Sequence, residues 1–172
     1  MFFLQKTNQK IYMEEKMKKN KIARLFASVL FMFALPVFAI SGAKFITPAV
    51  KDGKITISKA ELSNHPLYVN YDSKGITVQL IAVKASDNSA RVSLNTCQSC
   101  NPSPRAFFLE KNGRLVCQNC GNVFKMDSVG TPSFGCNPMS IPYEVSGNSV
   151  TVKTSDLDSF AGKFKNWKGP VK

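Results

Sequence analysis

Five cysteines carry most of the chemical information in this chain of 172 residues. They comprise two C-x2-C pairs, with sixteen residues between the pairs, and a fifth cysteine in the sequence Gly-Cys-Asn-Pro. Each C-x2-C turn, called a knuckle below, directs two sulfurs toward one point, and two knuckles at this spacing are typical of a four-thiolate metal site. The sequence therefore predicts a metal centre whose candidate ligands are Cys97, Cys100, Cys117, Cys120 and Cys136.

The residues beside the cysteines agree with this interpretation. A residue that tolerates positive φ is expected after the second cysteine of each knuckle, and Asn101 and Gly121 occupy these positions. Asn112-Gly113 favours a hairpin turn between the pairs, which would place the two knuckles side by side. The Gly and Pro around Cys136 favour a turn that positions this residue, so its sulfur is expected close to the other four.

Other uses of the cysteines stay open at the level of sequence. In an oxidising compartment cysteines usually form disulfides, but an odd number leaves one unpaired. Cys136 could then be a lone buried thiol. Thiolates suit zinc, a single iron, an iron–sulfur cluster or copper, whereas c-type haem is excluded because no histidine follows either pair. His65, Met126 and Met139 are interpreted as structural residues rather than ligands.

The hydrophobic pattern predicts a mainly β fold: a small antiparallel sheet domain with two knuckles and one short C-terminal helix. Apolar residues alternate with polar ones, which indicates half-buried strands joined by polar turns. The expected strands lie near residues 55–57, 76–83, 92–94, 106–109, 115–116, 141–145 and 150–152. The expected helix covers about 155–163, with Thr154 or Ser155 as its N-cap.

The first part of the chain has the order of a secretory signal peptide. Basic residues from Lys18 to Arg24 precede an apolar run from Leu25 to Ile40, and small residues follow. We therefore predict two parts: residues 1–43 as an upstream extension plus signal peptide, starting naturally at Met17, and residues 44–172 as one cysteine-rich domain. The protein is expected to be exported to a periplasmic or other extracytoplasmic location. An uncleaved leader acting as a membrane anchor is the alternative.

Charge and motifs limit the function further. The formal net charge is +12, but seven of the 23 Lys and Arg residues precede residue 44 and the others are scattered. Nucleic-acid binding is therefore not expected, because it requires basic residues clustered on one element. Paired catalytic carboxylates, a nucleophile motif and a phosphate loop are not visible, so the sequence does not support an enzyme that turns over a substrate.

The cysteine pattern resembles the FtrD-like membrane iron–sulfur protein family. The resemblance rests on Cys-x2-Cys, a Gly-containing hairpin, Val-Cys-x2-Cys-Gly, Phe124 three residues after that Gly, and Gly-Cys-Asn-Pro. Upstream, His65, Tyr68 and the segment 82–87 also resemble the family, and the similarity extends over about residues 50–164. The chain departs from the family pattern at Ala106-Phe107 and at Phe134, where members usually carry Gly-Tyr and Gly.

The resemblance implies an extracytoplasmic domain that binds an iron–sulfur cluster beside membrane permease components of iron uptake. The expected function is an exported metal or iron–sulfur protein that transfers an electron or a metal ion. A structural zinc-ribbon-like module and a thiol–disulfide or copper-handling protein are the alternatives. The leader has no Arg-Arg pair for export of folded cargo, which fits a centre of Fe, Zn or Cu assembled after export.

Cleavage of the leader can be tested directly. Because small residues end the apolar run, we expect the mature chain to begin between Ile40 and Lys44. Intact-mass measurement of protein from its native membrane or periplasm checks this. A mass that retains the apolar run from Leu25 to Ala39 would instead show that the leader stays as an anchor.

Overall fold

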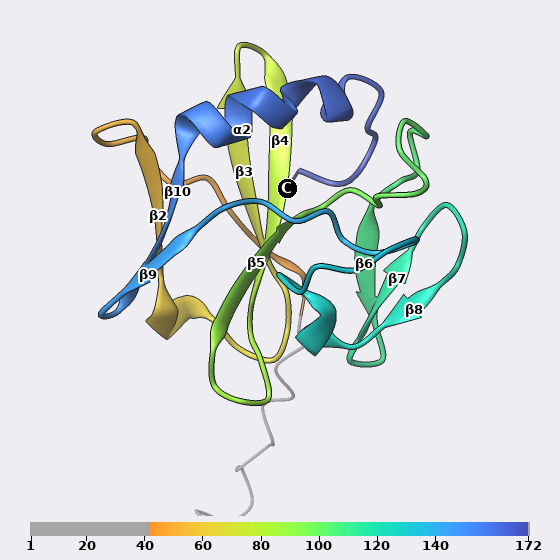
Figure 1. Ribbon diagram of the computed structural model, residues 1–172, viewed down its shortest axis with the longest axis horizontal. Coiled ribbons are helices and arrows are strands. Elements are labelled where there is room, and N and C mark those ends of the chain that lie inside the picture. The colour runs from red at the N-terminus through yellow and green to blue at the C-terminus, as the bar shows by residue number, and fades with distance from the viewer. Residues whose placement is uncertain (1–41, 172) are drawn as a thin grey trace, which may run out of the picture. The chain divides into compact units, whose positions relative to one another are not determined.

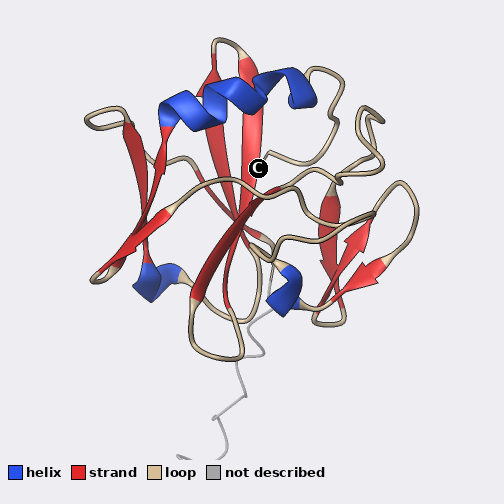
Figure 2. Cartoon of the chain, viewed as in Figure 1, coloured by secondary structure: helices blue, strands red, loops and turns tan. Residues whose placement is uncertain are grey.

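The computed structural model describes residues 42–171, and this part of the chain is built mainly from strands in three small sheets (Figure 1). The strands are β1 (Lys44–Ile46), β2 (Lys54–Ser58), β3 (Leu67–Ser73), β4 (Ile76–Lys84), β5 (Ala90–Leu94), β6 (Phe108–Lys111), β7 (Arg114–Cys117), β8 (Val123–Phe124), β9 (Glu144–Ser146) and β10 (Ser149–Lys153). The helices are α2 (Thr154–Phe160) and three short 3₁₀ turns, η1 (Lys59–Glu61), η2 (Met126–Ser128) and η3 (Ala161–Phe164). The expected mainly β fold with one short C-terminal helix is confirmed (Figure 2).

The central sheet has the order β1-β3-β4-β5 and separates two hydrophobic cores. β4 pairs antiparallel with both β3 and β5, while β1 adds to β3 in parallel. Leu80 and Ala82 of β4 belong to one core, and the alternating residues Ile81 and Val83 belong to the other. This double burial explains why the sequence of β4 becomes continuously apolar, since both faces of the strand are covered.

The first core is closed by elements from opposite ends of the described chain. β2 pairs with β10 in the sheet β2-β10-β9, so that Ile55 lies opposite Val152 and Ile57 opposite Val150. α2 follows β10 and crosses over β3 and β4 in the view of Figure 1. Its buried residue Leu157 packs into the same core.

The second core supports the cysteines. β6, β7 and β8 form a separate antiparallel sheet, which lies on the opposite side of the central sheet from β2, β9 and β10 in Figure 1. Phe108 and Leu115 of this sheet pack with Ile81 of β4. Cys97 and Cys117 are buried members of the same core, so one side of the predicted metal centre packs against apolar residues.

Asn95 connects the central sheet, the β6–β7–β8 sheet and the C-terminal segment by hydrogen bonds. Its fully buried side chain donates from Nδ2 to Oε1 of Gln79 in β4 at 2.6 Å and accepts from the N–H of Phe108 in β6 at 2.8 Å. Its backbone carbonyl accepts from the indole Nε1 of Trp167 at 2.8 Å. Because Asn95 lies two residues before Cys97, these bonds fix the approach of the chain to the first knuckle.

Several local expectations are corrected. α2 has Lys153 as its N-cap without a side-chain bond, and the hydroxyl of Thr154 instead donates to the carbonyl of Gly53 at 3.1 Å. The strand expected from residue 141 begins only at Glu144, after Pro142. β1 and β8 were not anticipated, and β3 was not indicated by the hydrophobic pattern, although the family resemblance at His65 and Tyr68 implies a strand there. The predicted leader lies almost wholly in residues 1–41, outside the described residues, and within residues 42–171 no helix has the length and hydropathy to cross a membrane.

The role of Asn95 predicts a large stability effect. Asn95→Ala leaves Oε1 of Gln79 and the Phe108 N–H without their buried partners, so we expect a loss of about 3 kcal/mol in the free energy of unfolding. Asn64→Ala is the matched control, because Asn64 is exposed. Urea denaturation of both variants checks the difference. Equal midpoints for the two variants would contradict the joining role.

Candidate metal centre

All five cysteine sulfurs lie together at one edge of the domain. Sγ of Cys136 is 3.2 Å from Sγ of Cys97 and 3.2 Å from Sγ of Cys120. Sγ of Cys117 is 3.9 Å from Sγ of Cys100. The sulfurs of Cys97, Cys100, Cys117 and Cys136 lie within 4.8 Å of one another. The compact set of four therefore includes Cys136, whereas the knuckle spacing alone favoured Cys120.

The two knuckles have the same backbone turn. The N–H of Asn101 donates to the carbonyl of Cys97 at 3.0 Å, and the N–H of Gly121 donates to the carbonyl of Cys117 at 2.9 Å. Gly121 has the expected positive φ of 77°. For Asn101 the expectation of positive φ is wrong, because the ring of the following Pro102 favours an extended conformation in the residue before it.

Asn101 has a different function in the fold. Its side-chain amide donates to Oγ1 of Thr96 at 3.0 Å and to the backbone carbonyl of Lys163 in η3 at 2.7 Å. These bonds attach the first knuckle to the C-terminal segment. Between the knuckles, the hydroxyl of Ser103 donates to Oδ1 of Asn119 at 2.7 Å. The sequence analysis missed these polar contacts, since Ser and Asn are common in any turn.

A short antiparallel pairing positions Cys136. The carbonyls of Asn137 and Thr96 accept from the N–H groups of Gln98 and Met139 at 2.9 and 3.0 Å, respectively. Cys97 and Pro138 form a β-bridge in the same ladder. The chain after Cys136 is thus fixed against the chain before the first knuckle. This explains how a cysteine sixteen residues beyond Cys120 reaches the site.

Backbone N–H groups stabilise negative charge on three of the sulfurs. Burial acts to raise the pKa of Cys97, but contact with Cys136 and N–H donation from Cys100 and Ser99 bring the pKa below its ordinary value. N–H donation from Asn122 is the main cause that lowers the pKa of Cys120 to about 7. Cys117 also accepts from two backbone N–H groups of its knuckle, yet burial raises its pKa to about 12.

The remaining sulfurs resist ionisation in the absence of a cation. Burial raises the pKa of Cys100 and of Cys136, and the neighbouring sulfurs add to the effect. Such a set of thiols can lose its protons together only when a positive ion binds at the same point. The donor set and its spacing fit a thiophilic metal: bonds of 2.3 Å in a tetrahedron place sulfurs ~3.8 Å apart.

The centre is buried on one side and open on the other. Cys97 and Cys117 are buried, whereas Cys120 is exposed. Close to the exposed cysteine in sequence, Val123 has 59% of its surface exposed, and Phe134, two residues before Cys136, is fully exposed. Two exposed apolar side chains therefore lie close in sequence to cysteines of the centre.

The residues interpreted as structural take part in contacts of the fold. Nδ1 of His65 contacts Oε1 of Glu110 in β6 at 2.5 Å. Met126 is buried in the second core, and Met139 packs against the first. Within the described residues, His65 does not join the group of potential metal ligands. The assignment of the five cysteines as ligands stays a prediction.

A comparison with family models supports the same chemistry. The model described as "Membrane iron-sulfur containing protein FtrD-like" matches residues 63–164. The matched segment contains all five cysteines, the whole central pairing of β3, β4 and β5, and the helix α2. A search of curated proteins gave no significant match.

The thiols are predicted to differ in reactivity. In the reduced, metal-free chain, Cys120 should be alkylated first by iodoacetamide, because it is exposed and its pKa is about 7. At neutral pH this thiol carries roughly ten times more thiolate than an ordinary cysteine. Its rate should rise with pH around 7 and then level off. Mass spectrometry of the peptides checks the order, with buried Cys117 as the internal control. Equal rates at Cys117 and Cys120 would contradict it.

Proposed function

The chain belongs to the FtrD-like family of membrane iron–sulfur containing proteins, and we propose on that basis that its five-cysteine centre binds metal in the service of iron uptake. The observation that carries the proposal is the convergence of five sulfurs from three separate segments of the chain. The protein would act as an exported accessory that passes on an electron or a metal ion. The absence of visible turnover chemistry in the sequence is consistent with this role.

The spacing of the sulfurs favours one ion over a large cluster. Four sulfurs within 4.8 Å of one another fit a single tetrahedral ion, whereas the thiolates around a cubane bind different irons and must stand further apart. Iron held in this way would supply one-electron chemistry, zinc would supply structure alone, and copper would supply a soft cargo ion. We infer single-ion binding, with iron as the candidate that agrees with the family description.

The cysteines of the centre have different roles in this proposal. Backbone N–H groups of the two knuckles donate to the sulfurs of Cys97 and Cys117 and hold them from the buried side. Cys136 lies between Cys97 and Cys120 at 3.2 Å from each. The exposed Cys120 can therefore act as a fifth thiolate at which metal enters or leaves, while the four compact sulfurs keep their positions.

Location and partners follow from the same proposal. An exported chain, tethered at the membrane or free beside it, would meet membrane iron-permease components from the outside. The exposed apolar side chains of Phe134 and Val123, which are close in sequence to Cys136 and Cys120, suit contact with such a protein. A short path between a donor and the sulfurs is needed for electron or metal transfer, and the exposed Cys120 offers it.

A thiol–disulfide function is the second candidate, and the position of Cys136 favours it. Cys120 and Cys136 are close enough to form a disulfide with little movement, in which two thiols would lose two protons and two electrons to a partner disulfide. Cys97 could then displace Cys120 from Cys136 by exchange. This candidate predicts a metal-free protein in its own compartment.

Elemental analysis and spectra of protein purified from that compartment separate these functions. We expect about one metal ion per chain. For iron we also expect a visible thiolate-to-metal absorption that changes on reduction. Cys136→Ser should weaken metal retention by about tenfold or more, because it removes a member of the compact set. Cys120→Ser, the matched control, should retain more metal than Cys136→Ser does. It should also exchange this metal more slowly than the wild type does.

Circular dichroism shows whether both variants are folded, because the apolar base of the site does not depend on Cys136. Wild-type metal content and spectrum in folded Cys136→Ser would contradict the compact set. Four irons with acid-labile sulfide per chain would overturn the single-ion inference. A colourless protein with stoichiometric zinc would favour the structural module.

A further inference from the structure

A basic pocket lies at the end of the central sheet away from the cysteines. β5 runs from Ala90, which pairs with Lys84, to Leu94, and the chain then continues to the first knuckle. The pocket lies at the Ala90 end and has a volume of about 420 Å³. The strand β5 therefore separates the pocket from the metal centre, and the two sites share no residue.

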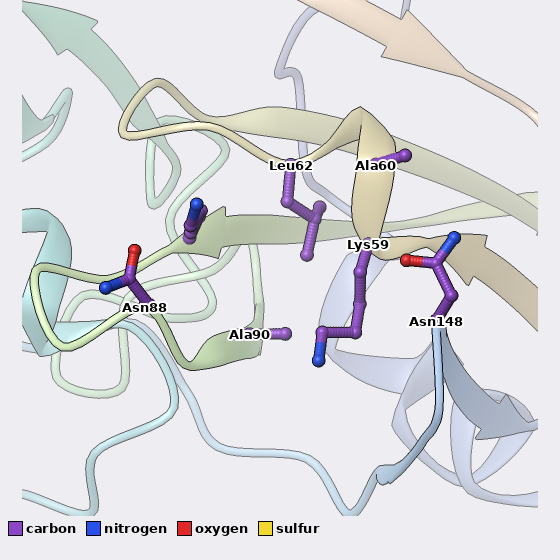
Figure 3. A pocket seen from close by; sticks show the side chains of 7 residues that line it. Lys59, Ala60, Leu62, Asn88, Ala90 and Asn148 are labelled. Carbon is purple, nitrogen blue, oxygen red and sulfur yellow. The ribbon is translucent and has the colours of Figure 1, made fainter.

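Donors surround an apolar floor in this pocket. Lys59 and Lys84 supply ammonium groups, Asn88 and Asn148 supply amides, and no carboxylate is among the lining residues. Figure 3 shows the side chain of Lys59 extending beside Ala90, with Asn88 and Asn148 on opposite sides. The floor contains the buried residues Leu62 and Ala90.

The acidic residues near Lys59 and Lys84 pair with other basic residues, so the positive charges of these two lysines are not neutralised by them. Glu61 follows Lys59 closely in sequence but pairs with Lys44 at 3.4 Å, and Asp87 pairs with Arg91 at 2.7 Å. Among residues 42–171, neither Lys59 nor Lys84 forms an ion pair. The two lysines and the amide donors attract an anion, because no carboxylate of the protein already balances the positive charge of the lysines.

The basic surface extends past this pocket. Lys84 also lines an adjacent pocket that contains Arg114 and Lys125, together with Asp127. The carboxylate of Asp127 already accepts from the backbone N–H and the hydroxyl of Ser86, both at 2.8 Å. The excess positive charge therefore continues along this end of the sheet.

We propose that the Lys59–Lys84 pocket binds a phosphate group. Lysine binds phosphate as a point charge, and the outer oxygens of a phosphate, three in a monoester and two in a diester headgroup, can accept from several donors at once. The phosphate can come from a free anion or from the headgroup of an anionic lipid. Both sources present the same chemistry to the pocket.

The course of the chain gives the lipid source a geometric basis. Lys44 of β1 pairs with Leu67, and Leu67 pairs with Ala82, so the described chain enters the sheet at the pocket end. A protein tethered through its N-terminal side would bring this end close to the headgroups. This step rests on the membrane association in the proposed function, whereas the phosphate site itself does not.

The test compares the full-length wild-type chain with Lys59→Gln/Lys84→Gln. Lys74→Gln/Lys165→Gln is the charge-matched control, since both lysines are exposed and lie outside the pocket lining. Binding of inorganic phosphate is measured by calorimetry at constant ionic strength. Binding to phosphatidylcholine vesicles with and without phosphatidylglycerol is measured by flotation. We expect the pocket variant to bind roughly fivefold more weakly for each lysine removed, and the control to bind like the wild type.

Each result decides the proposal. A pocket-specific loss with phosphate supports a free anion, and a pocket-specific loss only with phosphatidylglycerol supports the lipid headgroup. Equal behaviour of the pocket variant and the control in both arms overturns the proposal and leaves only a general effect of net charge. Metal content of the same variants is measured in parallel. Failure of the phosphate site with unchanged metal content is thereby distinguishable from failure of the metal centre.

Discussion

Repulsion among crowded thiolates is the constraint on which this structure depends. Sulfur atoms 3.2 to 3.9 Å apart, two of them on buried residues, cannot all carry a negative charge unless a cation lies between them. Without it, burial keeps protons on Cys117 and Cys136 by raising the pKa of each thiol. The surrounding fold must therefore hold together groups that would separate in their ionised form. A bound metal ion would reverse the sign of this interaction, and the same crowding would then become a source of stability.

The fold meets this constraint by fixing each sulfur from a different direction. The first knuckle is attached to η3 through Asn101, and the chain before it is attached to β4 and β6 through Asn95. The second knuckle ends the β6–β7 hairpin, whose Phe108 packs on the central sheet. Cys136 is held by its own ladder to residues 96–98. Because these supports come from distant parts of the chain, the centre is complete only when the whole domain is folded.

The sequence was informative where one residue type determines local geometry. Asn112 and Gly113 both adopt the positive φ expected of the hairpin turn, and Gly121 follows the second knuckle as expected. Cysteine spacing led to the family, and the alternation of apolar and polar residues led to a mainly β fold. β3 was missed because it is buried on both faces and interrupts its apolar residues with Asn70, whose amide oxygen accepts from Gln79 inside the domain. Long-range polar pairs of this kind leave no periodic signal in one sequence.

The membership of Cys136 in the compact set illustrates the same limit more sharply. Spacing within the chain assigns Cys97, Cys100, Cys117 and Cys120 to one site, since each pair is local and the pairs are related by a hairpin. In the structure, Cys136 takes the place of Cys120 in the compact set. This arrangement depends on the backbone pairing of Asn137 and Met139 with the chain around the first knuckle, which sequence spacing does not encode. That pairing places Cys136 among the buried sulfurs and leaves Cys120 on the exposed side. The five sulfurs are thereby divided into a compact set of four and one accessible sulfur, an arrangement that would suit exchange of a bound ion better than a closed structural site would.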